Sequence, residues 1–432
     1  MPLSTNMIKI LTLGTPKPIN FFFLACVCFY ILCLSLRINP VIAMMGALAY
    51  SFSTYNPVII AAGHDTQMLA TAFMPLLMAG LINIYEKRYW LGFALTTFGA
   101  YQQIGVNHLQ VTYYFFLIAF IITIAFLVKW IKEKDWKHIG IAAAATIAAA
   151  IIGVAGNALV LKTTAEYSQF TMRGGKDIDI SGDSVKATKT KGLDTAYAFE
   201  YSVGRGETVT FIMPNAYGGY SNNMTGEGSH VVKKLADMGV QESNAEQVAQ
   251  SLPKYWGKLY TSGPAYLGVL ICLFGLLGFI LVKSPLRWGL LAATLLGIMM
   301  SWGKYLPGFN TFLFEHLPLY NKFRSPAFAQ VIQQFTVGIS AVLALQHLIF
   351  GEPISKADLK KILYTAAGLF ALLGMMYMTL NYASPFDGQI AKSISQQAQN
   401  ESLGRAVISG LKADRKALFG GQLMRTLAFM LM

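Results

Sequence analysis

Hydrophobic residues occur along this chain in long runs, and short polar stretches separate one run from the next. Several runs extend over about 18 or more residues with almost no charge, which is the length that a helix needs to cross about 30 Å of hydrocarbon. Such runs cross a bilayer as helices, because lipid offers no hydrogen-bond partner to an unpaired backbone group. The pattern therefore predicts an all-α polytopic membrane protein with about 10–11 transmembrane helices.

The expected spans differ in length, and two of them, Trp90–Gln103 and Trp288–Trp302, are short enough for partial embedding. A further apolar stretch, Phe419–Met432, lasts about two or three turns, whereas a spanning helix needs about 20 residues. We therefore expect the chain to be a piece of a longer protein. The full set of expected spans is Ile19–Leu36, Pro40–Ala62, Thr66–Tyr85, Trp90–Gln103, Leu109–Val128, Ile139–Leu161, Ala265–Val282, Trp288–Trp302, Ala327–Phe350 and Ile362–Leu380.

The Lys and Arg residues of the short loops predict the orientation of these helices. They occur in alternate loops, whereas the opposite turns, around Gly63–Asp65 and Ile104–His108, contain none. Because cytoplasmic loops are enriched in Lys and Arg, the basic loops are predicted to be cytoplasmic and the opposite turns extracytoplasmic. The basic set comprises Arg37, Lys87, Arg88, Lys129, Lys132, Lys134, Lys137, Lys283, Arg287, Lys356, Lys360 and Lys361.

A long polar segment, residues 162–258, separates the apolar helices of residues 1–161 from those of residues 259–432. The orientation places this segment outside, together with the loops 304–326 and 383–420. Aromatic and apolar residues recur through the segment, which indicates a folded extracytoplasmic insert rather than a disordered linker.

Local patterns predict a small α/β fold for this insert. Residues Glu207–Met213 alternate between polar and apolar side chains as a strand does. A short helix is predicted at Ser229–Met238. A second helix is predicted to run from Ser243, which has the capping-box spacing to Glu246, as far as Ser251.

Composition supports a membrane protein and excludes several other classes. Hydrophobic residues make up 54% of the chain and charged residues 13%, whereas an average soluble domain has about 25% charged residues. The net charge is +13, but no basic run is interleaved with aromatic residues, so no nucleic-acid partner is expected. The four cysteines lie inside apolar runs without disulfide or zinc spacing. Glycine-rich phosphate loops, Gly-x-Ser-x-Gly and His-Glu-x-x-His are also missing.

Two outer turns carry the first candidate residues. In one turn, His64 and Asp65 precede a predicted helix, where Asp65 is either a helix cap or a general base or metal ligand. In the next turn, Asn107 and His108 either tether the two turns by hydrogen bonds or contribute to a site. If the helices pack as neighbours, all four residues share one outward pocket. Two histidines and a carboxylate would suit a divalent metal, which is the one cofactor that we consider.

A third group of candidates precedes the span that begins at Ala327. Lys322 and Arg324 are expected just outside this span, against the usual bias of basic residues toward the cytoplasm. Together with Tyr320 they suit the binding of a phosphate or pyrophosphate group. The alternative is that the apolar stems of both side chains lie along the hydrocarbon, while their charged ends bind the lipid head groups.

The fourth group lies in the insert. Glu207 and Tyr217 combine a carboxylate and an aromatic ring, a combination that suits sugar recognition. The alternative is that these residues form the small core of the insert, and we prefer this interpretation for Trp256.

Taken together, these segments resemble the bacterial YfhO membrane-protein family. The resemblance covers nearly the whole chain and depends on several motifs occurring in one order. They are Ala62-Gly63-His64-Asp65, Asn107-His108-Leu109-Gln110 with Tyr113-Tyr114, Pro214-Asn215-Ala216-Tyr217-Gly218-Gly219, Tyr255-Trp256-Gly257 with Thr261-Ser262-Gly263-Pro264, and Tyr320-Asn321-Lys322-Phe323-Arg324-Ser325-Pro326.

That family is similar to the polytopic GT-C glycosyltransferases, so the resemblance implies a GT-C-like fold in the bacterial cytoplasmic membrane. It implies transfer of a sugar from a polyprenyl-phosphate donor to an envelope polymer or glycolipid acceptor outside. In this scheme Asp65 activates the acceptor, Lys322 and Arg324 hold the donor phosphate, and His64 and His108 orient the acceptor or a metal. The family's usual acidic residue in the first outer loop has no counterpart in Met1–Pro18, so the resemblance implies that this chain lacks one catalytic element.

A non-enzymatic transporter, flippase or scaffold for envelope lipids is the alternative. Transporters favour charged residues within the spans and helices broken near the midplane. The sequence shows almost no charge in the middle of a span. This pattern favours chemistry at the membrane surface.

Overall fold

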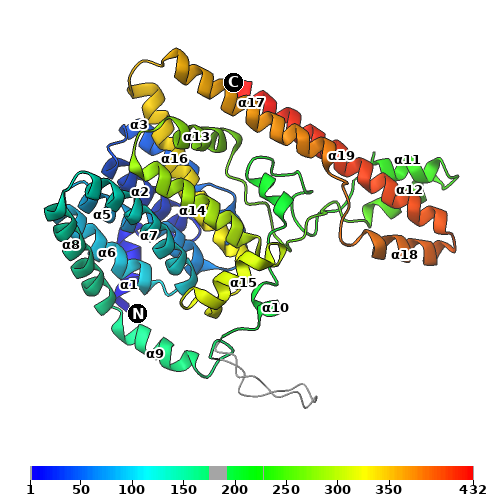
Figure 1. The fold of residues 1–432 in the computed structure, drawn as a ribbon. Helices are drawn as coiled ribbons and strands as arrows, with labels where there is room; N and C mark the ends of the chain where they lie inside the picture. Colours follow the sequence, from blue (N-terminus) through cyan, green and yellow to red (C-terminus); the bar gives the residue numbers. More distant parts are fainter. Residues whose placement is uncertain (1, 175–191, 227, 432) are drawn as a thin grey trace. The chain divides into compact units, whose positions relative to one another are not determined.

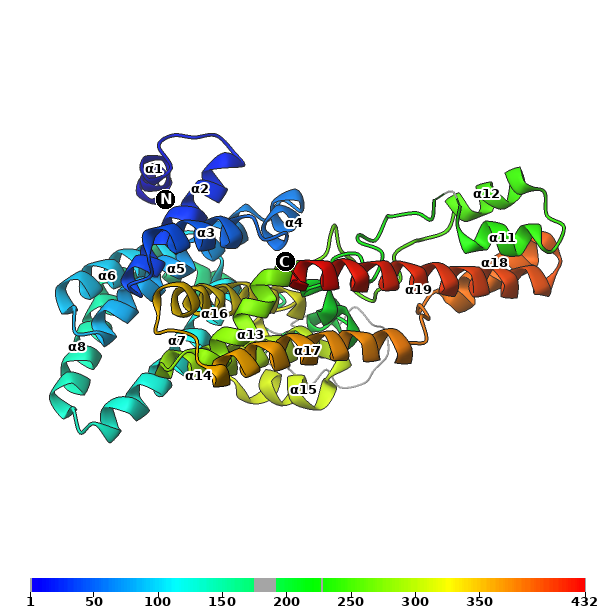
Figure 2. The ribbon, with the colours of Figure 1, turned by 90° about the horizontal axis from the view of Figure 1, so that it is seen from above.

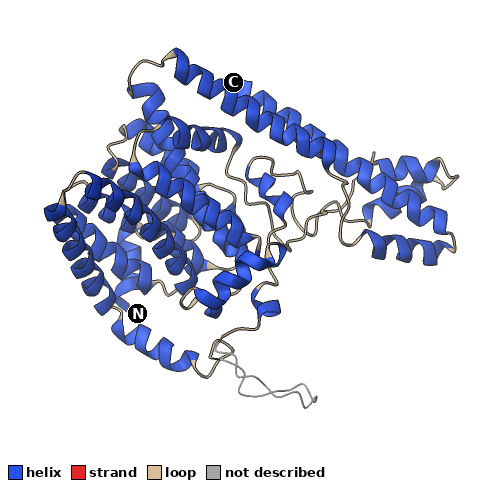
Figure 3. Cartoon of the chain, viewed as in Figure 1, coloured by secondary structure: helices blue, strands red, loops and turns tan. Residues whose placement is uncertain are grey.

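The computed structural model describes residues 2–174, 192–226 and 228–431, and Figure 1 shows their path. Their contacts form two compact units. Unit 1 comprises Met1–Ser202 and Phe274–Ser355, and unit 2 comprises Val203–Leu273 and Lys356–Met432. Within the described ranges the regular elements are helices, without a β-strand (Figure 3). The expected division at residues 161 and 258 therefore differs from the grouping by contacts.

Unit 1 is a bundle of apolar helices around one central helix, α5 (Asp65–Tyr85). This helix is almost completely buried, and it packs most extensively against α6 (Tyr89–Gly105) and α2 (Ile19–Ser35). Helix α13 (Val269–Leu281) contains the point where the chain passes from one unit to the other. The other α-helices of unit 1 are α1 (Pro2–Leu11), α3 (Pro40–Ser51), α4 (Tyr55–Ala61), α7 (Leu109–Lys132), α8 (Trp136–Ala155), α9 (Ala158–Ser168), α10 (Thr195–Ala198), α14 (Pro285–Ser301), α15 (Pro307–His316) and α16 (Gln330–Phe350).

Several helices have the length and composition of membrane spans. In the described part of the chain, five helical segments are long and apolar enough to cross a bilayer: Asp65–Tyr85, Leu109–Lys132, Trp136–Ala155, Pro326–Phe350 and Lys356–Thr379. The helices α2, α13 and α14 are apolar but shorter. These features are those of a helical membrane protein.

Two expected spans are interrupted in the structure, and the apolar stretch near residue 419 belongs to a longer helix. The span Pro40–Ala62 is two helices, because the chain turns between α3 and α4. The side chain of Asn56 donates hydrogen bonds to the carbonyl oxygens of Tyr50 and Ser51, which compensates for the helical bonds lost at the break. Likewise, α8 ends at Ala155 and α9 starts at Ala158. Phe419–Met432 does not begin a helix, since its described residues form the end of the long helix α19 (Glu401–Leu431).

Glycines allow α5 and α6 to approach closely. A Cβ atom added to Gly80 of α5 would lie 2.4 Å from the backbone nitrogen of Thr96. A Cβ atom added to Gly92 of α6 would lie 2.5 Å from the backbone nitrogen of Ile84. Small residues at such crossings bring helix backbones into van der Waals contact, which is a main source of attraction between helices in lipid.

Unit 2 is built around α19, which packs against α18 (Asp387–Ala398), α11 (His230–Ala236) and α17 (Lys356–Thr379). Figure 2 shows α11, α12 (Glu242–Gln250), α18 and α19 side by side. Their core consists of aliphatic side chains, which include Val231, Leu235, Ala249, Val407 and Leu411. The insert and the C-terminal helices thus share one hydrophobic core.

The expected α/β character of the insert is wrong for its described residues. Residues Glu207–Met213 do not form a strand: Arg205–Phe211 is a 3-10 helix, η1. The backbone N–H of Gly204 donates to the Glu207 carboxylate at 2.6 Å, which stabilises a turn instead of an extended chain. In the described part of the insert, the β-type contact is an isolated antiparallel bridge between Met224 and Pro253.

The two short helices of the insert are confirmed, with different limits. α11 begins after Ser229, whose hydroxyl accepts hydrogen bonds from the N–H groups of Val231 and Val232. α12 begins at Glu242, so Ser243 lies inside its first turn, and the capping box predicted from Ser243 was wrong.

Candidate functional site

His64 and His108 lie close together at the ends of two helices of unit 1. Each occupies the N-cap position, His64 before α5 and His108 before α7. The ring of Phe328 lies between these two turns, with centroids 5.6 Å from His64 and 6.0 Å from His108. Phe328 belongs to a 3-10 turn, Pro326–Ala329, far along the chain. The two histidines, from turns far apart in the sequence, therefore lie against the same aromatic ring.

Hydrogen bonds give the two rings different proton arrangements. His64 Nδ1 donates to the Oε1 atom of Gln67 at 3.2 Å, which leaves Nε2 of a neutral ring as an acceptor. His108 Nδ1 accepts from the backbone N–H of Val111 at 3.2 Å, so a neutral His108 carries its proton on Nε2. His64 is thus the possible proton acceptor of the pair, and His108 is a hydrogen-bond donor.

Acidification is expected to destabilise unit 1 through His108. Burial, assisted by the positive charges of His64 and Arg173, lowers the pKa of His108 from its usual 6.5 to about 4. Between these values the unfolded chain binds the proton more readily, so the stability is fully present above pH 6.5 and is lost as the pH falls toward 4. From pH 7 to pH 5 the free energy of unfolding should fall by about 2 kcal/mol.

Denaturant unfolding at a series of pH values measures this effect. In the variant His108→Gln, whose side-chain oxygen can still accept from Val111, this part of the pH dependence should disappear. An unchanged pH profile in the variant would show that other groups cause the acid sensitivity.

Asp65 and Asn107 occupy the same two turns in different ways. Asp65 follows the N-cap position rather than filling it, and its carboxylate accepts a hydrogen bond from Lys17 in an exposed ion pair. The positive end of α5 also stabilises a negative charge at this position. Asn107 is exposed and has a φ of 57°, which Asn tolerates better than most residues, so it forms the tight turn before α7.

The segment that carries Tyr320, Lys322 and Arg324 packs on the start of α7. Gln110 Nε2 donates to the carbonyl oxygen of Arg324 at 2.7 Å, and the Tyr113 hydroxyl donates to that of Pro318 at 2.8 Å. Tyr320 is buried with its ring stacked on Tyr113 at 6.3 Å. Two groups of candidates that are far apart in the sequence therefore lie against one another.

The cations of this segment are held by three neighbours, Arg173, Tyr197 and Tyr201. Lys322 Nζ donates to the carbonyl oxygen of Arg173 at 2.5 Å, and Arg173 Nε donates to that of Lys322 at 3.0 Å. The guanidinium of Arg324 lies 5.0 Å from the ring centre of Tyr197 and 5.9 Å from that of Tyr201, and it donates to the Tyr197 hydroxyl. Fixed in this way, Arg324 is pre-organised to present its remaining donors.

Sequence reasoning missed several residues of this site. The residues that contact the candidates but belong to segments not singled out are Lys17, Arg173, Tyr197 and Phe328. Arg173 carried one usable signal, since it is a basic residue in a segment predicted to be outside. The other three lie in no motif, and only the packing of distant segments reveals them.

A metal site is not assembled among the described residues. They contain no group of three or more His, Cys, Asp and Glu side chains that could hold a metal ion. The carboxylate expected to complete such a site, that of Asp65, is paired with Lys17.

Glu207 and Tyr217 belong to unit 2, where both are buried. Glu207 Oε1 accepts hydrogen bonds from the Tyr255 hydroxyl at 2.8 Å and from the Lys258 N–H at 2.9 Å, and burial raises the pKa of this carboxyl. Tyr217 stacks on Trp256 at a centroid distance of 4.1 Å. Trp256 is 3% exposed, and its indole N–H donates to a backbone carbonyl, which confirms its assignment to a small core.

Comparison of the chain with protein-family models, with curated proteins and with solved structures finds no match.

Proposed function

We propose that this protein is a membrane glycosyltransferase that moves a sugar from a polyprenyl-phosphate donor to an envelope acceptor at the extracytoplasmic face. The observation that carries the proposal is the grouping of His64, His108, Lys322 and Arg324 at the ends of α5 and α7. These side chains combine a proton acceptor, a neutral donor and cations at one end of an apolar bundle. Sugar transfer from a lipid phosphate requires these three kinds of group.

The proposed reaction needs no oxidant or further reactant. An acceptor hydroxyl attacks the anomeric carbon, the bond between that carbon and the phosphate oxygen breaks, and the hydroxyl proton passes to a base. Asp65 is the proposed base, and His64 Nε2 is its nearest alternative. Lys322 and Arg324, with Arg173, stabilise the negative charge on the departing lipid phosphate.

The proposal includes a GT-C-like arrangement of about 10–11 spans, counting the shorter apolar helices together with the long ones. It places the protein in the bacterial cytoplasmic membrane, with residues 162–258 outside. Its basis is the distribution of Lys and Arg between loops and the resemblance to the YfhO family.

The charge distribution within the bundle favours this proposal over a transporter or flippase. Among the described residues, the buried Asp, Glu, Lys and Arg side chains are Glu207, Asp387 and Arg415, and all three belong to unit 2. A transport pathway through the bundle of unit 1 would be expected to contain such groups. Their absence from the described part of this bundle supports chemistry at the surface.

Sugar transfer by the protein in lipid nanodiscs, with labelled polyprenyl-phosphate sugars, tests the proposal. Asp65→Asn should lower transfer by about 100-fold or more, which is typical for loss of a general base. Lys17→Met breaks the same ion pair but keeps the carboxylate, so it should retain most of the activity. Glu133→Gln, at the opposite end of α7, is the control for loss of an acidic side chain.

The outcomes separate the possible roles. Equal losses in Asp65→Asn and Lys17→Met would mean that the ion pair only supports the turn, and His64 would become the proposed base. Arg324→Lys should mainly raise the KM for the donor, because lysine keeps the charge but not the planar fork. Folded protein without transfer from any polyprenyl-phosphate sugar would overturn the proposal in favour of a lipid transporter or scaffold.

A further inference from the structure

Unit 1 contains a cavity of about 590 Å³ between the second half of α7 and the start of α14. The two helices pack side by side (Figure 1). They approach closely at Gly289, where an added Cβ atom would lie 2.9 Å from the Cα atom of Ile122. Gly289 also lines the cavity, together with the exposed side chains of Val128 and Trp288. The cavity therefore lies over the line where the two helices meet, and it opens on the surface of the bundle.

The lining residues of α7 form one stripe along this helix, which is long and apolar enough to cross a bilayer. Residues three and four positions apart lie on the same helix face, and the stripe follows this spacing. It includes Ile121, Ile124, Ala125, Val128, Lys129 and Lys132. From Ile121 to Lys132 it rises about 16 Å, at about 1.5 Å per residue. This is about half of a hydrocarbon core of about 30 Å, so the stripe has the depth of one lipid leaflet.

The polar end of the stripe is positive. Lys129 and Lys132 lie in the last turn of α7, and both are exposed. Glu133 also lines the cavity, so one positive charge remains in excess at this end. On α14, the exposed ring of Trp288 lies 4.7 Å from the guanidinium of Arg287. Lysine, arginine and tryptophan at one end of a span are typical of the level of the lipid head groups.

This lining selects a ligand that combines an apolar chain with a negative group. A lipid acyl chain would cover the apolar stripe, and a phosphate would accept hydrogen bonds from Lys129 and Lys132. A free phosphate would leave the apolar stripe uncovered, and a lipid without net charge would leave the excess positive charge uncompensated. An anionic phospholipid satisfies both parts of the cavity.

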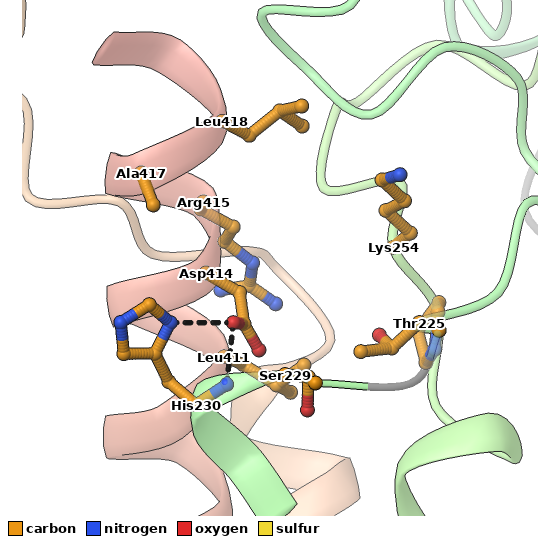
Figure 4. A pocket seen from close by; sticks show the side chains of 12 residues that line it. Thr225, Ser229, His230, Lys254, Leu411, Asp414, Arg415, Ala417 and Leu418 are labelled. Atoms are coloured by element: carbon orange, nitrogen blue, oxygen red, sulfur yellow. Dashed lines mark hydrogen bonds and ion pairs between the residues drawn. The ribbon is translucent and has the colours of Figure 1, made fainter. Parts of the chain in front are cut away.

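The charged residues of α19 that line a cavity in unit 2 are, by contrast, bound within the protein. Asp414 accepts hydrogen bonds from the backbone N–H of His230 at 2.7 Å and from its Nδ1 at 2.8 Å (Figure 4). The guanidinium of Arg415 binds the carboxylate of Asp387. The exposed lysines of α7 are therefore better placed to hold a ligand.

From this arrangement we infer that the cavity between α7 and α14 binds one anionic phospholipid, with an acyl chain along the apolar stripe and the phosphate at Lys129 and Lys132. The site lies at the end of α7 opposite to His108, which precedes its first turn. It is therefore separate from the proposed transfer site, and it binds its lipid whether or not the protein transfers sugar.

Native mass spectrometry of the whole protein, purified in detergent and depleted of lipid, tests the inference. The probes are phosphatidylglycerol, which is anionic, and phosphatidylethanolamine with the same acyl chains, which has no net charge. We expect one phosphatidylglycerol to be retained at least tenfold more tightly than phosphatidylethanolamine. Equal retention, or a preference for phosphatidylethanolamine, would overturn the inference. Displacement of phosphatidylglycerol by an equal concentration of glycerol 3-phosphate would overturn it in favour of a site for free phosphate.

Two variants locate the lipid in this cavity. Lys129→Gln/Lys132→Gln removes the positive end and should weaken retention of phosphatidylglycerol at least tenfold, with little effect on phosphatidylethanolamine. Ala292→Leu, at an exposed lining residue of α14, narrows the cavity without changing its charge and should weaken retention of both lipids.

Lys356→Gln/Lys360→Gln is the matched control for the loss of two lysines. Both residues are exposed in the first turns of α17, so their loss should leave the retained phosphatidylglycerol in place. Undiminished retention by the folded Lys129→Gln/Lys132→Gln variant, or an equal loss in the control, would show that the lipid does not bind at this cavity. Because the readout is lipid retention, loss of sugar transfer does not affect the result.

Discussion

Replacing Asp387 by alanine is expected to lower the free energy of unfolding of unit 2 by about 3–5 kcal/mol. The side chains of Arg415 and Asp387 are 3% and 11% exposed, and two parallel hydrogen bonds join them. Asp387 also accepts from the N–H of Ser384 at 2.9 Å. Without the carboxylate, the guanidinium remains buried without its opposite charge, which costs far more than an exposed ion pair contributes.

Denaturant unfolding, with hydrogen exchange of α18 and α19 as the local probe, measures this loss. Asp358→Asn is the matched control, because Asp358 forms an exposed ion pair with Lys361 in the first turn of α17 and should contribute less than about 1 kcal/mol. The double variant Asp387→Leu/Arg415→Met should recover much of the stability, since it removes both buried charges. A single variant as mild as the control would contradict the assignment of a buried, structural ion pair.

Replacing Gly80 by leucine is expected to destabilise unit 1 by more than about 3 kcal/mol, beyond the usual range for overpacked sites. The first carbon of the new side chain would already lie 2.4 Å from both the backbone nitrogen and the hydroxyl oxygen of Thr96. Relief requires α6 to move away from α5, and this separation would also disturb the contact of Gly92 with Ile84. Helices in lipid associate through such close packing, so few other interactions in the bundle would compensate for its loss.

Gly140→Leu provides the control for this substitution. Gly140 lies in α8, and a Cβ atom there would meet no other atom within 4 Å. Heating in detergent followed by size-exclusion chromatography should show a large loss of folded protein for Gly80→Leu and little change for Gly140→Leu. Equal behaviour of the two variants would mean that α5 and α6 are not packed as closely as described.

Most helices of unit 1 could be predicted because their signals are local. The expected spans Ile19–Leu36 and Thr66–Tyr85 differ from α2 and α5 by one residue at an end. A continuous apolar run specifies a helix wherever it lies, because its backbone must satisfy its own hydrogen bonds in lipid. The break inside Pro40–Ala62 escaped prediction, since it depends on the Asn56 side chain.

The insert shows where local reasoning fails. The alternation of Glu207–Met213 resembled a strand, but Glu207 accepts hydrogen bonds from backbone groups about fifty residues away, at Lys258 and Leu259. These bonds favour a compact turn, and no neighbouring strand is present in the described chain to pair with an extended segment. A pattern of period two predicts a strand only where a partner exists.

The candidate site, too, could be predicted from the sequence only in part. The residue types at His64, Asp65, His108, Lys322 and Arg324 were readable from the chain, because polar groups are rare in an apolar protein and their positions near the ends of helices are local facts. The tertiary structure alone decided three other features. It places Phe328 between the two histidines and pairs Lys17 with Asp65. It also gives α19 a core shared with the insert. Such contacts join segments distant in the sequence, and they depend on how whole helices pack rather than on the residues beside each one.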